Sequence, residues 1–149
     1  WPSRQTPPMH LLRRVFEHCA SYDEARRMLR ATPIAIPAIF ALAGTGEEGC
    51  VIERTADRAF VHPAPRAITN HWLTPGLRGR PRGQRSDLRL ACMEGRYRGA
   101  GDDFQWLVSP VLNPTTRLAA SLDAATGRLV AQGWEADGPA TAVLRLQIA

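Results

Sequence analysis

Residues 116–134 read TRLAASLDAATGRLVAQGW, and this stretch decides the fold class. From Thr116 to Asp123, apolar residues recur at every second position, which is typical of a half-buried β-strand. The segment Asp123–Gly127 is rich in turn-forming residues and leads into a second strand, from Arg128 to Trp134. Apolar residues alternate again over residues 144–148. The end of the chain therefore predicts an antiparallel sheet.

The first part of the chain predicts two helices. Apolar residues recur at helical spacing from Met9 to Cys19, so a first helix is expected from about Pro8 to Ala20. The sequence Ser21-Tyr22-Asp23-Glu24 has the form of a capping box and predicts a second helix to about Arg30. Pro33 ends that helix, because proline cannot continue the hydrogen-bond pattern.

More strands and a third helix are predicted between these regions. The apolar run Ile34–Ala43 and the segment Val51–Arg54 predict two strands joined by a hairpin at Gly44–Gly49. Ala59–His62 is a candidate third strand. The segment from Ser86 to about Arg96 is a candidate helix.

Length and composition fit one globular domain. The chain has 149 residues, of which 44% are apolar and 22% are charged, values typical of globular proteins. Since helices come first and an antiparallel sheet follows, we expect an α+β fold in a single domain or fragment that covers residues 1–149. No window approaches the ~18 consecutive apolar residues of a membrane-spanning helix, so we expect no membrane span.

The basic residues are all arginine. There are 19 of them against 14 acidic residues, which gives a net charge of +5, and this composition is typical of a GC-rich bacterial genome. Without lysine, Schiff-base and lysine-nucleophile chemistry is excluded. Cys19, Cys50 and Cys92 have no C-x-x-C spacing, so they support neither a disulfide framework nor a zinc site, and we interpret them as small buried apolar residues. The cysteines therefore do not indicate a cellular compartment. The four histidines lack metal-ligand spacing, and we expect no metal and no cofactor.

A basic segment lies between positions 78 and 98. It contains Arg78, Arg80, Arg82, Arg85, Arg89, Arg96 and Arg98. Guanidinium groups can bind nucleic-acid phosphates, but single-strand binding also uses interleaved aromatic residues, and only Trp72 and Tyr97 lie nearby. We interpret the segment as a solvated loop and do not expect a nucleic-acid partner; if one exists, its affinity falls steeply as salt rises.

The segment Thr69-Asn70-His71-Trp72 is the leading candidate for a polar site. An asparagine amide can donate a hydrogen bond to an oxyanion that develops during acyl transfer. Taken alone, the four residues predict only a polar turn. Local chemistry therefore predicts an α+β domain without an assigned function.

The order of several segments along the chain is informative. These segments are Leu11–Val15, Ser21–Ala25, Ile39–Gly44, Gly49–Arg54, Thr69–Trp72, Pro110–Thr116 and Leu122–Gly127. In content and order they resemble the later part of the acid ceramidase and N-acylethanolamine acid amidase family. That family lies within the choloylglycine hydrolase-like group of N-terminal-nucleophile hydrolases, which also includes isopenicillin N acyltransferase-like proteins. The resemblance extends from about Pro8 to Trp134.

The resemblance implies part of an αββα sandwich and hydrolysis of an N-acyl amide, or acyl transfer, by an N-terminal cysteine that self-cleavage exposes. In that mechanism the thiolate attacks the amide carbonyl, its own α-amine is the general base, and fixed donors hold the oxyanion. Asn70 matches the family's oxyanion-hole asparagine, and either Arg85 or Arg89 matches its active-site arginine. The neighbouring residues with an implied substrate-binding role are Thr69, His71 and Trp72.

The chain departs from the family at its first residue. Position 1 is Trp1, so this chain has no N-terminal Cys, Ser or Thr, and the Arg and Asp that follow the family's nucleophile have no counterpart. The interval from Asn70 to Trp72 is also shorter than in the family. We therefore expect the chain alone to be inactive, and either to need the missing N-terminal half or to self-associate through exposed apolar edges.

A second interpretation comes from a different class of protein. The chain is then a non-catalytic binding or scaffold module, derived from the same fold, that binds an anionic partner through the Arg78–Arg98 segment. A cysteine nucleophile encoded upstream would distinguish the enzyme from this module.

Overall fold

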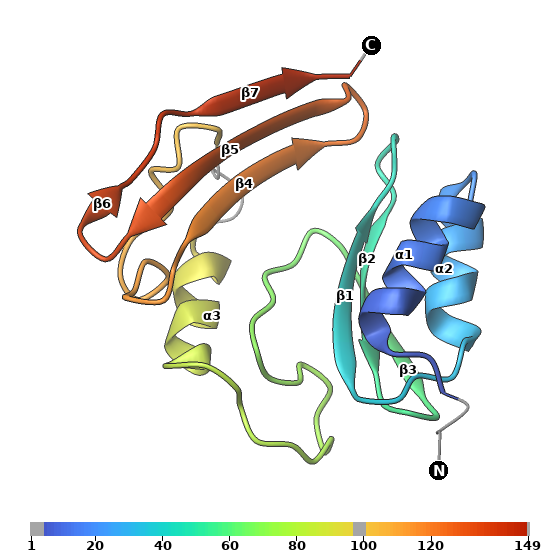
Figure 1. Cartoon of the computed structure of the whole chain (residues 1–149). Coiled ribbons are helices and arrows are strands. Elements are labelled where there is room, and N and C mark those ends of the chain that lie inside the picture. The colour runs from blue at the N-terminus through green and yellow to red at the C-terminus, as the bar shows by residue number, and fades with distance from the viewer. Residues whose placement is uncertain (1–4, 97–100, 149) are drawn as a thin grey trace. The chain divides into compact units, whose positions relative to one another are not determined.

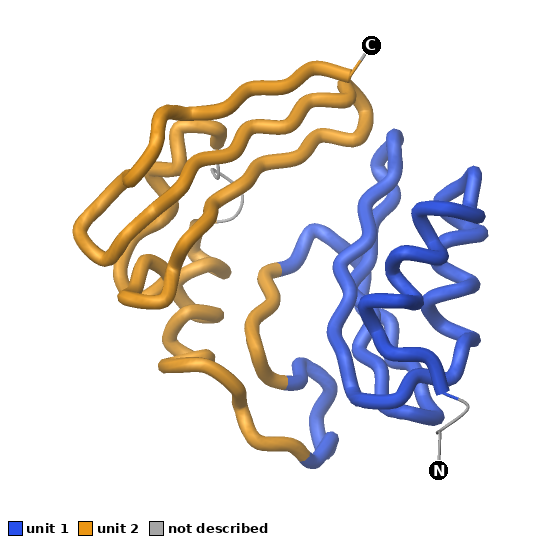
Figure 2. Tube along the Cα trace, in the orientation of Figure 1, with its two compact units in different colours: residues 1–66, 72–78 blue, residues 67–71, 79–149 orange. Residues whose placement is uncertain are grey.

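The computed structural model describes residues 5–96 and 101–148 and has the α+β class that the sequence predicts (Figure 1). The chain divides into two compact units (Figure 2). The first unit comprises residues 1–66 and 72–78, and the second comprises residues 67–71 and 79–149. Each unit has its own hydrophobic core. That both belong to a single domain or fragment stays a prediction.

The first unit begins with the two predicted helices, α1 (Pro8–His18) and α2 (Tyr22–Ala31). The predicted cap of α2 is confirmed at Ser21, whose hydroxyl accepts the Glu24 N–H at 3.3 Å and so satisfies an amide that the helix start would leave without a partner. The Glu24 carboxylate reaches back as expected, but it accepts the N–H of Ala20, one residue before the cap, at 2.8 Å. The predicted box therefore fixes where α2 begins.

Three antiparallel strands complete the first unit, in the order β1 (Ala38–Ala43), β2 (Gly49–Arg54) and β3 (Ala59–Pro63). The hairpin between β1 and β2 is confirmed, and the Gly44 N–H donates to the Glu48 carbonyl at 3.0 Å. Helices α1 and α2 lie side by side on one face of this sheet (Figure 1). The buried residues between them are Leu11, Val15, Ala25, Leu29, Ile34, Phe40, Cys50 and Ile52.

The first strand is shorter than the sequence predicts. We expected it from Ile34, but it begins at Ala38. Pro37 has no N–H to donate to a neighbouring strand, and Ile34 instead forms an isolated bridge to Thr6 and is fully buried. The apolar run therefore contains a buried anchor followed by a strand.

A buried arginine ties the sheet to the end of α2. Arg54 is 2% exposed, and its guanidinium donates to the carbonyl oxygens of Leu29, Thr32 (2.7 Å) and Arg58 (3.3 Å). The last carbonyls of a helix lack partners within the helix. A cation near them is also stabilising, because the C-terminal end of the helix dipole is negative. Burial lowers the pKa of Arg54 from its ordinary value, and the three carbonyls compensate for its removal from water.

Arg54→Met is expected to destabilise the first unit by about 2 kcal/mol, because it keeps the side-chain volume but leaves buried carbonyls without donors. Arg54→Lys should recover only part of this loss, since one ammonium cannot reproduce the fork of a guanidinium. Urea denaturation measures both. Arg30→Met, on the exposed end of α2, is the matched control; equal midpoints for Arg54→Met and this control would contradict the capping role.

The second unit contains helix α3 (Ser86–Glu94) and a sheet formed by β4 (Leu118–Asp123), β5 (Arg128–Glu135), β6 (Gly138–Pro139) and β7 (Leu144–Gln147). The predicted antiparallel pairing is confirmed, with β5 between β4 and β7. At the turn between β4 and β5, Gly127 has φ +66° and an added Cβ would lie 2.8 Å from the Ile148 carbonyl oxygen, so only glycine fits. The short strand β6 was not predicted.

The loop before β4 covers one face of this sheet. Phe104 and Leu107 from the loop are buried against Ala119 of β4 and Val130 of β5. The ring of Trp134 meets that of Phe104 edge-on at 6.5 Å. The core of the second unit therefore lies on the face of the sheet that Ala119 and Val130 share.

Candidate functional site

Asn70 and Arg89 are brought together in the second unit. Arg89 lies on α3, and its Nη2 donates to the side-chain carbonyl oxygen Oδ1 of Asn70 at 2.8 Å. Its Nε donates to the Gln84 carbonyl at 2.9 Å, so the guanidinium is held at two points. The backbone of Asn70 is held as well, because its carbonyl accepts the Arg82 N–H at 2.8 Å.

The contact with Arg89 sets the direction of the Asn70 amide. A guanidinium has donors only, so the oxygen of the Asn70 side chain must face it and the NH2 group must face away. Within residues 5–96 and 101–148 this NH2 group has no hydrogen-bond acceptor, and Asn70 is exposed. The site therefore presents an oriented, accessible amide donor.

Ser86 connects the three residues Thr69, Asn70 and His71. Its hydroxyl accepts the Asn70 N–H at 3.0 Å and lies 2.8 Å from Nδ1 of His71 and 3.1 Å from the Thr69 hydroxyl. The Thr69 hydroxyl donates to the Ser86 carbonyl at 3.0 Å. These bonds fix the turn at Asn70 against the first residue of α3.

The Ser86–His71 pair has the spacing of a nucleophile and its base, but its surroundings favour a supporting role. Ser86 is 3% exposed, and its oxygen already accepts the Asn70 N–H. A nucleophile must reach a substrate carbon, which a buried hydroxyl cannot do. We therefore assign Ser86 and His71 to the support of the Asn70 turn.

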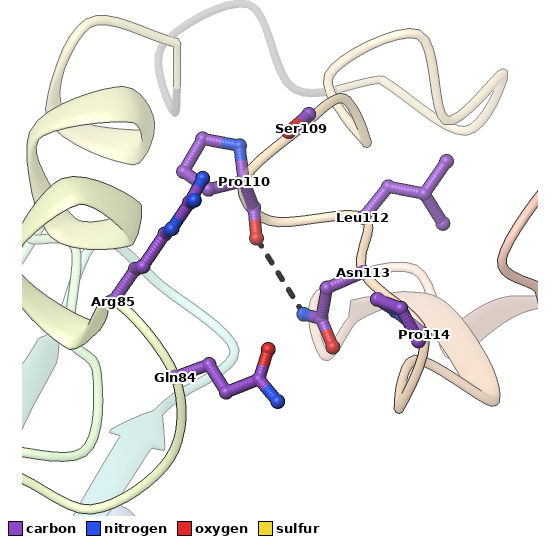
Figure 3. Close-up of a pocket in the computed structure, with 7 residues that line it drawn as sticks. All are labelled: Gln84, Arg85, Ser109, Pro110, Leu112, Asn113 and Pro114. Carbon is purple, nitrogen blue, oxygen red and sulfur yellow. Dashed lines mark hydrogen bonds between the residues drawn. The ribbon is translucent and has the colours of Figure 1, made fainter.

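Arg85 lies in a different environment from Arg89. It lines a hollow of about 240 Å³ together with Gln84, Ser109, Pro110, Leu112, Asn113 and Pro114. Figure 3 shows Gln84 and Arg85 facing the loop residues across this hollow. Arg85 has φ +48°, a left-handed conformation that is uncommon outside glycine and that recurs at functional sites.

The polar groups of the hollow divide into two kinds. The Asn113 side chain is used internally, since its Nδ2 donates to the Val111 carbonyl at 2.9 Å and its Oδ1 accepts the Thr115 N–H at 3.0 Å. The side chains of Gln84 and Arg85 make no hydrogen bond within the described ranges. The hollow therefore offers an amide and a guanidinium to a ligand.

Trp72 makes no hydrogen bond to the other predicted residues within the described part of the chain. It is half-buried and belongs to the first unit, whereas Asn70 belongs to the second. Among the arginines of the basic segment, Arg78, Arg80, Arg82, Arg85 and Arg96 are exposed. Trp1, Tyr97 and Arg98 lie outside the described residues.

The first unit contains a buried carboxylate that the sequence did not predict as a site. Glu53 on β2 is 0% exposed and accepts the backbone N–H groups of Leu73 and Thr74, the latter at 3.0 Å. The Thr74 hydroxyl donates to it at 2.6 Å and His62 Nε2 at 3.0 Å. Four donors thus hold the carboxylate, which fastens residues 73–74 to the sheet.

The same contacts decide the protonation of Glu53. Burial raises the pKa of the carboxyl group, but the hydrogen bonds from Thr74, Leu73 and His62 outweigh it and hold the pKa below the ordinary value of 4.5. The folded first unit therefore favours the ionised form.

A pH dependence of stability follows from this shift. Below the unfolded pKa the unfolded chain binds more protons at this site than the folded chain, so stability rises with pH in that window. We expect the contribution of Glu53 to be complete above about pH 5 and to be lost as the pH falls through the lower folded pKa. Urea midpoints at pH 7, 5, 4 and 3 test this, and Glu53→Gln should lose less stability between pH 5 and pH 3 than the natural chain does. If the urea midpoints of Glu53→Gln and of the natural chain fall equally between pH 5 and pH 3, Glu53 is not the cause of the pH dependence.

Within residues 5–96 and 101–148, no group of three or more His, Cys, Asp or Glu side chains is arranged to hold a metal ion. In the same ranges, no helix is long and apolar enough to cross a membrane. Cys50 is buried in the core of the first unit, as predicted. Cys19, which packs against that core, and Cys92 are only half-buried.

No protein-family model, curated protein or solved structure matches this chain. Any assignment of function therefore depends on the residues and geometry described above.

Two residues that organise these sites carried weak signals in the sequence. Ser86 directly precedes a helical pattern, where serine is common as a helix cap, but nothing in the sequence connects it to Asn70. Glu53 directly follows the apolar run Cys50–Ile52 in a predicted strand, and a charge in a buried strand requires hydrogen-bond partners. The sequence could therefore have predicted that Glu53 is hydrogen-bonded, but not that its partners are Leu73 and Thr74.

Proposed function

We propose that this chain is the oxyanion-binding part of an enzyme that cleaves linear C–N amide bonds, by hydrolysis of an N-acyl amide or by acyl transfer. The observation that carries the proposal is the contact between Arg89 and Asn70, which turns the Asn70 NH2 group outward as a fixed donor. The complete enzyme would have the αββα sandwich of the family that the sequence resembles.

Asn70 supports the chemistry by stabilising charge. When a thiolate attacks an amide carbonyl, a C–S bond forms and the carbonyl π electrons move to oxygen. Asn70 Nδ2 donates a hydrogen bond to that oxygen at about 2.7–3.1 Å from it, and this donor is already in place before the reaction. As the intermediate collapses, the C–N bond breaks and the amine leaves with the proton that the general base took from the thiol.

The nucleophile would be an N-terminal cysteine encoded outside this chain. Cys50 is 4% exposed and lies in the core, so it cannot reach a substrate. An N-terminal cysteine supplies both the thiol and an α-amine that acts as its base.

Arg85 is the residue that we assign to substrate orientation. Its guanidinium faces the hollow opposite residues 109–114 (Figure 3). The hollow of about 240 Å³ is smaller than the ~300–1,000 Å³ of sites that enclose whole drug-sized ligands, so it accommodates one end of a substrate. Arg89, which holds Asn70, is then a positioning residue.

The test is to express the complete open reading frame that encodes this chain and to measure intact masses and N-acyl amide hydrolysis. We expect two fragments, with a new N-terminal cysteine on the fragment that contains Asn70, and hydrolysis by the processed protein. Replacement of that cysteine by alanine should block both. A single unprocessed chain without an upstream cysteine and without hydrolysis would overturn the proposal.

That negative outcome would favour the second candidate, a binding module for an anionic partner. The observation in its favour is that Arg78, Arg80, Arg82 and Arg96 are exposed and form no ion pair within the described residues.

A further inference from the structure

One face of the sheet in the second unit is apolar, and most of its large side chains are exposed within the described residues. Paired residues of an antiparallel sheet share a face, so Leu122, Leu129 and Leu146 form one row across β4, β5 and β7. Ala120, Ala131 and Leu144 form the next row. This face is opposite to the one that packs on the loop before β4.

The exposure of this face is large for a monomer. Leu129 on the central strand is half-buried. The other large side chains of the face are between 51% and 74% exposed; they are Leu118, Leu122, Leu144, Leu146 and Ile148. Together they present an apolar area on the order of 600 Å², at the upper limit of the largest patch on a typical monomer. A standard interface buries about 800 Å² per partner, so the patch with its half-buried neighbours approaches the area that a stable dimer needs.

The chemistry of the face fits a second copy of the same chain. The two rows contain only leucine and alanine, so two copies can meet there without opposing like charges, although the whole chain has a net charge of +5. The charged residues of the strands, such as Arg145 and Asp123, alternate onto the other face. Interfaces between identical subunits are more apolar than those between different proteins, which usually carry charges that specify the partner.

The relief of the face is also self-complementary. The small side chains Ala120 and Ala131 lie in one row across β4 and β5, and the next row contains three leucines, Leu122, Leu129 and Leu146. When two sheets stack about 10 Å apart, large side chains of one sheet need small ones opposite them. A two-fold axis that runs between the two rows, in the plane between the stacked sheets, brings the leucine row of each copy over the alanine row of the other.

We propose that this chain forms a symmetric dimer through the apolar face of β4, β5 and β7, defined by Leu118, Leu122, Leu144, Leu146 and Ile148. The proposal uses no residue of the Asn70 site. If the N-terminal half of the proposed αββα sandwich covers this face, the dimer proposal fails and the amidase proposal stands.

The test is sedimentation velocity on the purified chain over a range of micromolar concentrations, together with the Leu122→Arg variant. We expect a species of twice the 16.4 kDa chain mass, and an increase of at least about 30-fold in the dissociation constant for Leu122→Arg, as for loss of an interface hot spot. Phe16→Arg is the matched control, because Phe16 is 79% exposed on α1 of the first unit. This control should dimerise like the natural chain.

A second measurement tests the dimer without a variant, so misfolding of Leu122→Arg cannot affect it. Hydrogen exchange of the natural chain should slow in β4 and β7 as concentration rises, while exchange in α1 stays constant. Sedimentation velocity on the product of the complete reading frame shows whether a second copy or another segment covers the apolar face. A monomer at all concentrations, a dimer that Leu122→Arg leaves intact, or a complete product in which another segment or protein covers this face would each overturn the proposal.

Discussion

Glu53→Ala is expected to destabilise the first unit by about 4 kcal/mol, because each buried donor left without an acceptor costs about 1–3 kcal/mol. The substitution removes the acceptor of the Leu73 and Thr74 N–H groups, and water cannot replace it at a side chain that is 0% exposed. Since a folded domain has only about 5–15 kcal/mol of stability, much of this unit's margin would be lost. The midpoint of urea denaturation measures the effect.

Two further variants separate this anchor from a general effect of removing a carboxylate. Glu47→Ala, in the exposed hairpin turn, should leave the midpoint nearly unchanged. Glu53→Gln should fall between the two, because an amide keeps one acceptor oxygen but turns its NH2 toward other donors. Hydrogen exchange should quicken first at Leu73 and Thr74. If Glu53→Ala and Glu47→Ala denature at the same urea concentration, Glu53 is not an anchor.

The secondary structure follows from local patterns, and the sequence therefore predicts most of it. The Ser21 capping box and the alternation before Asp123 act over a few residues, and both elements occur where they were expected. The division into two units depends on long-range contacts that no local pattern carries. The alternation after Thr116 likewise defines two faces but does not say which is covered, and the larger leucines lie on the uncovered one.

The candidate site shows the same limit. Sequence order alone left Arg85 and Arg89 as alternatives for one role. The fold separates them, because the α3 helix directs Arg89 to Asn70 while the left-handed Arg85 lines the hollow. No spacing rule could have shown that Ser86 reaches back to the Asn70 N–H across sixteen positions.

Asn70→Asp is expected to lower kcat for N-acyl amide hydrolysis by about 10³-fold in the product of the complete reading frame, more than Asn70→Ala, which should cost about 10²-fold. An aspartate keeps the oxygen that accepts from Arg89, and its charge strengthens that contact. Its second oxygen replaces the outward NH2 donor, so an acceptor with negative charge faces the developing oxyanion. KM should change little, because the lost interaction exists only in the transition state.

The comparison of the two variants distinguishes catalysis from structural support. If Asn70 only held the turn, aspartate would replace it well, and Asn70→Asp would be both more stable and more active than Asn70→Ala. The oxyanion role predicts the opposite order for activity and the same order for stability. Arg89→Gln should lower kcat about tenfold, since it frees the Asn70 amide to rotate, and Arg27→Gln on the exposed surface of α2 is the control. If Asn70→Asp is as active as Asn70→Ala or more active, Asn70 does not stabilise the oxyanion and only supports the turn before α3.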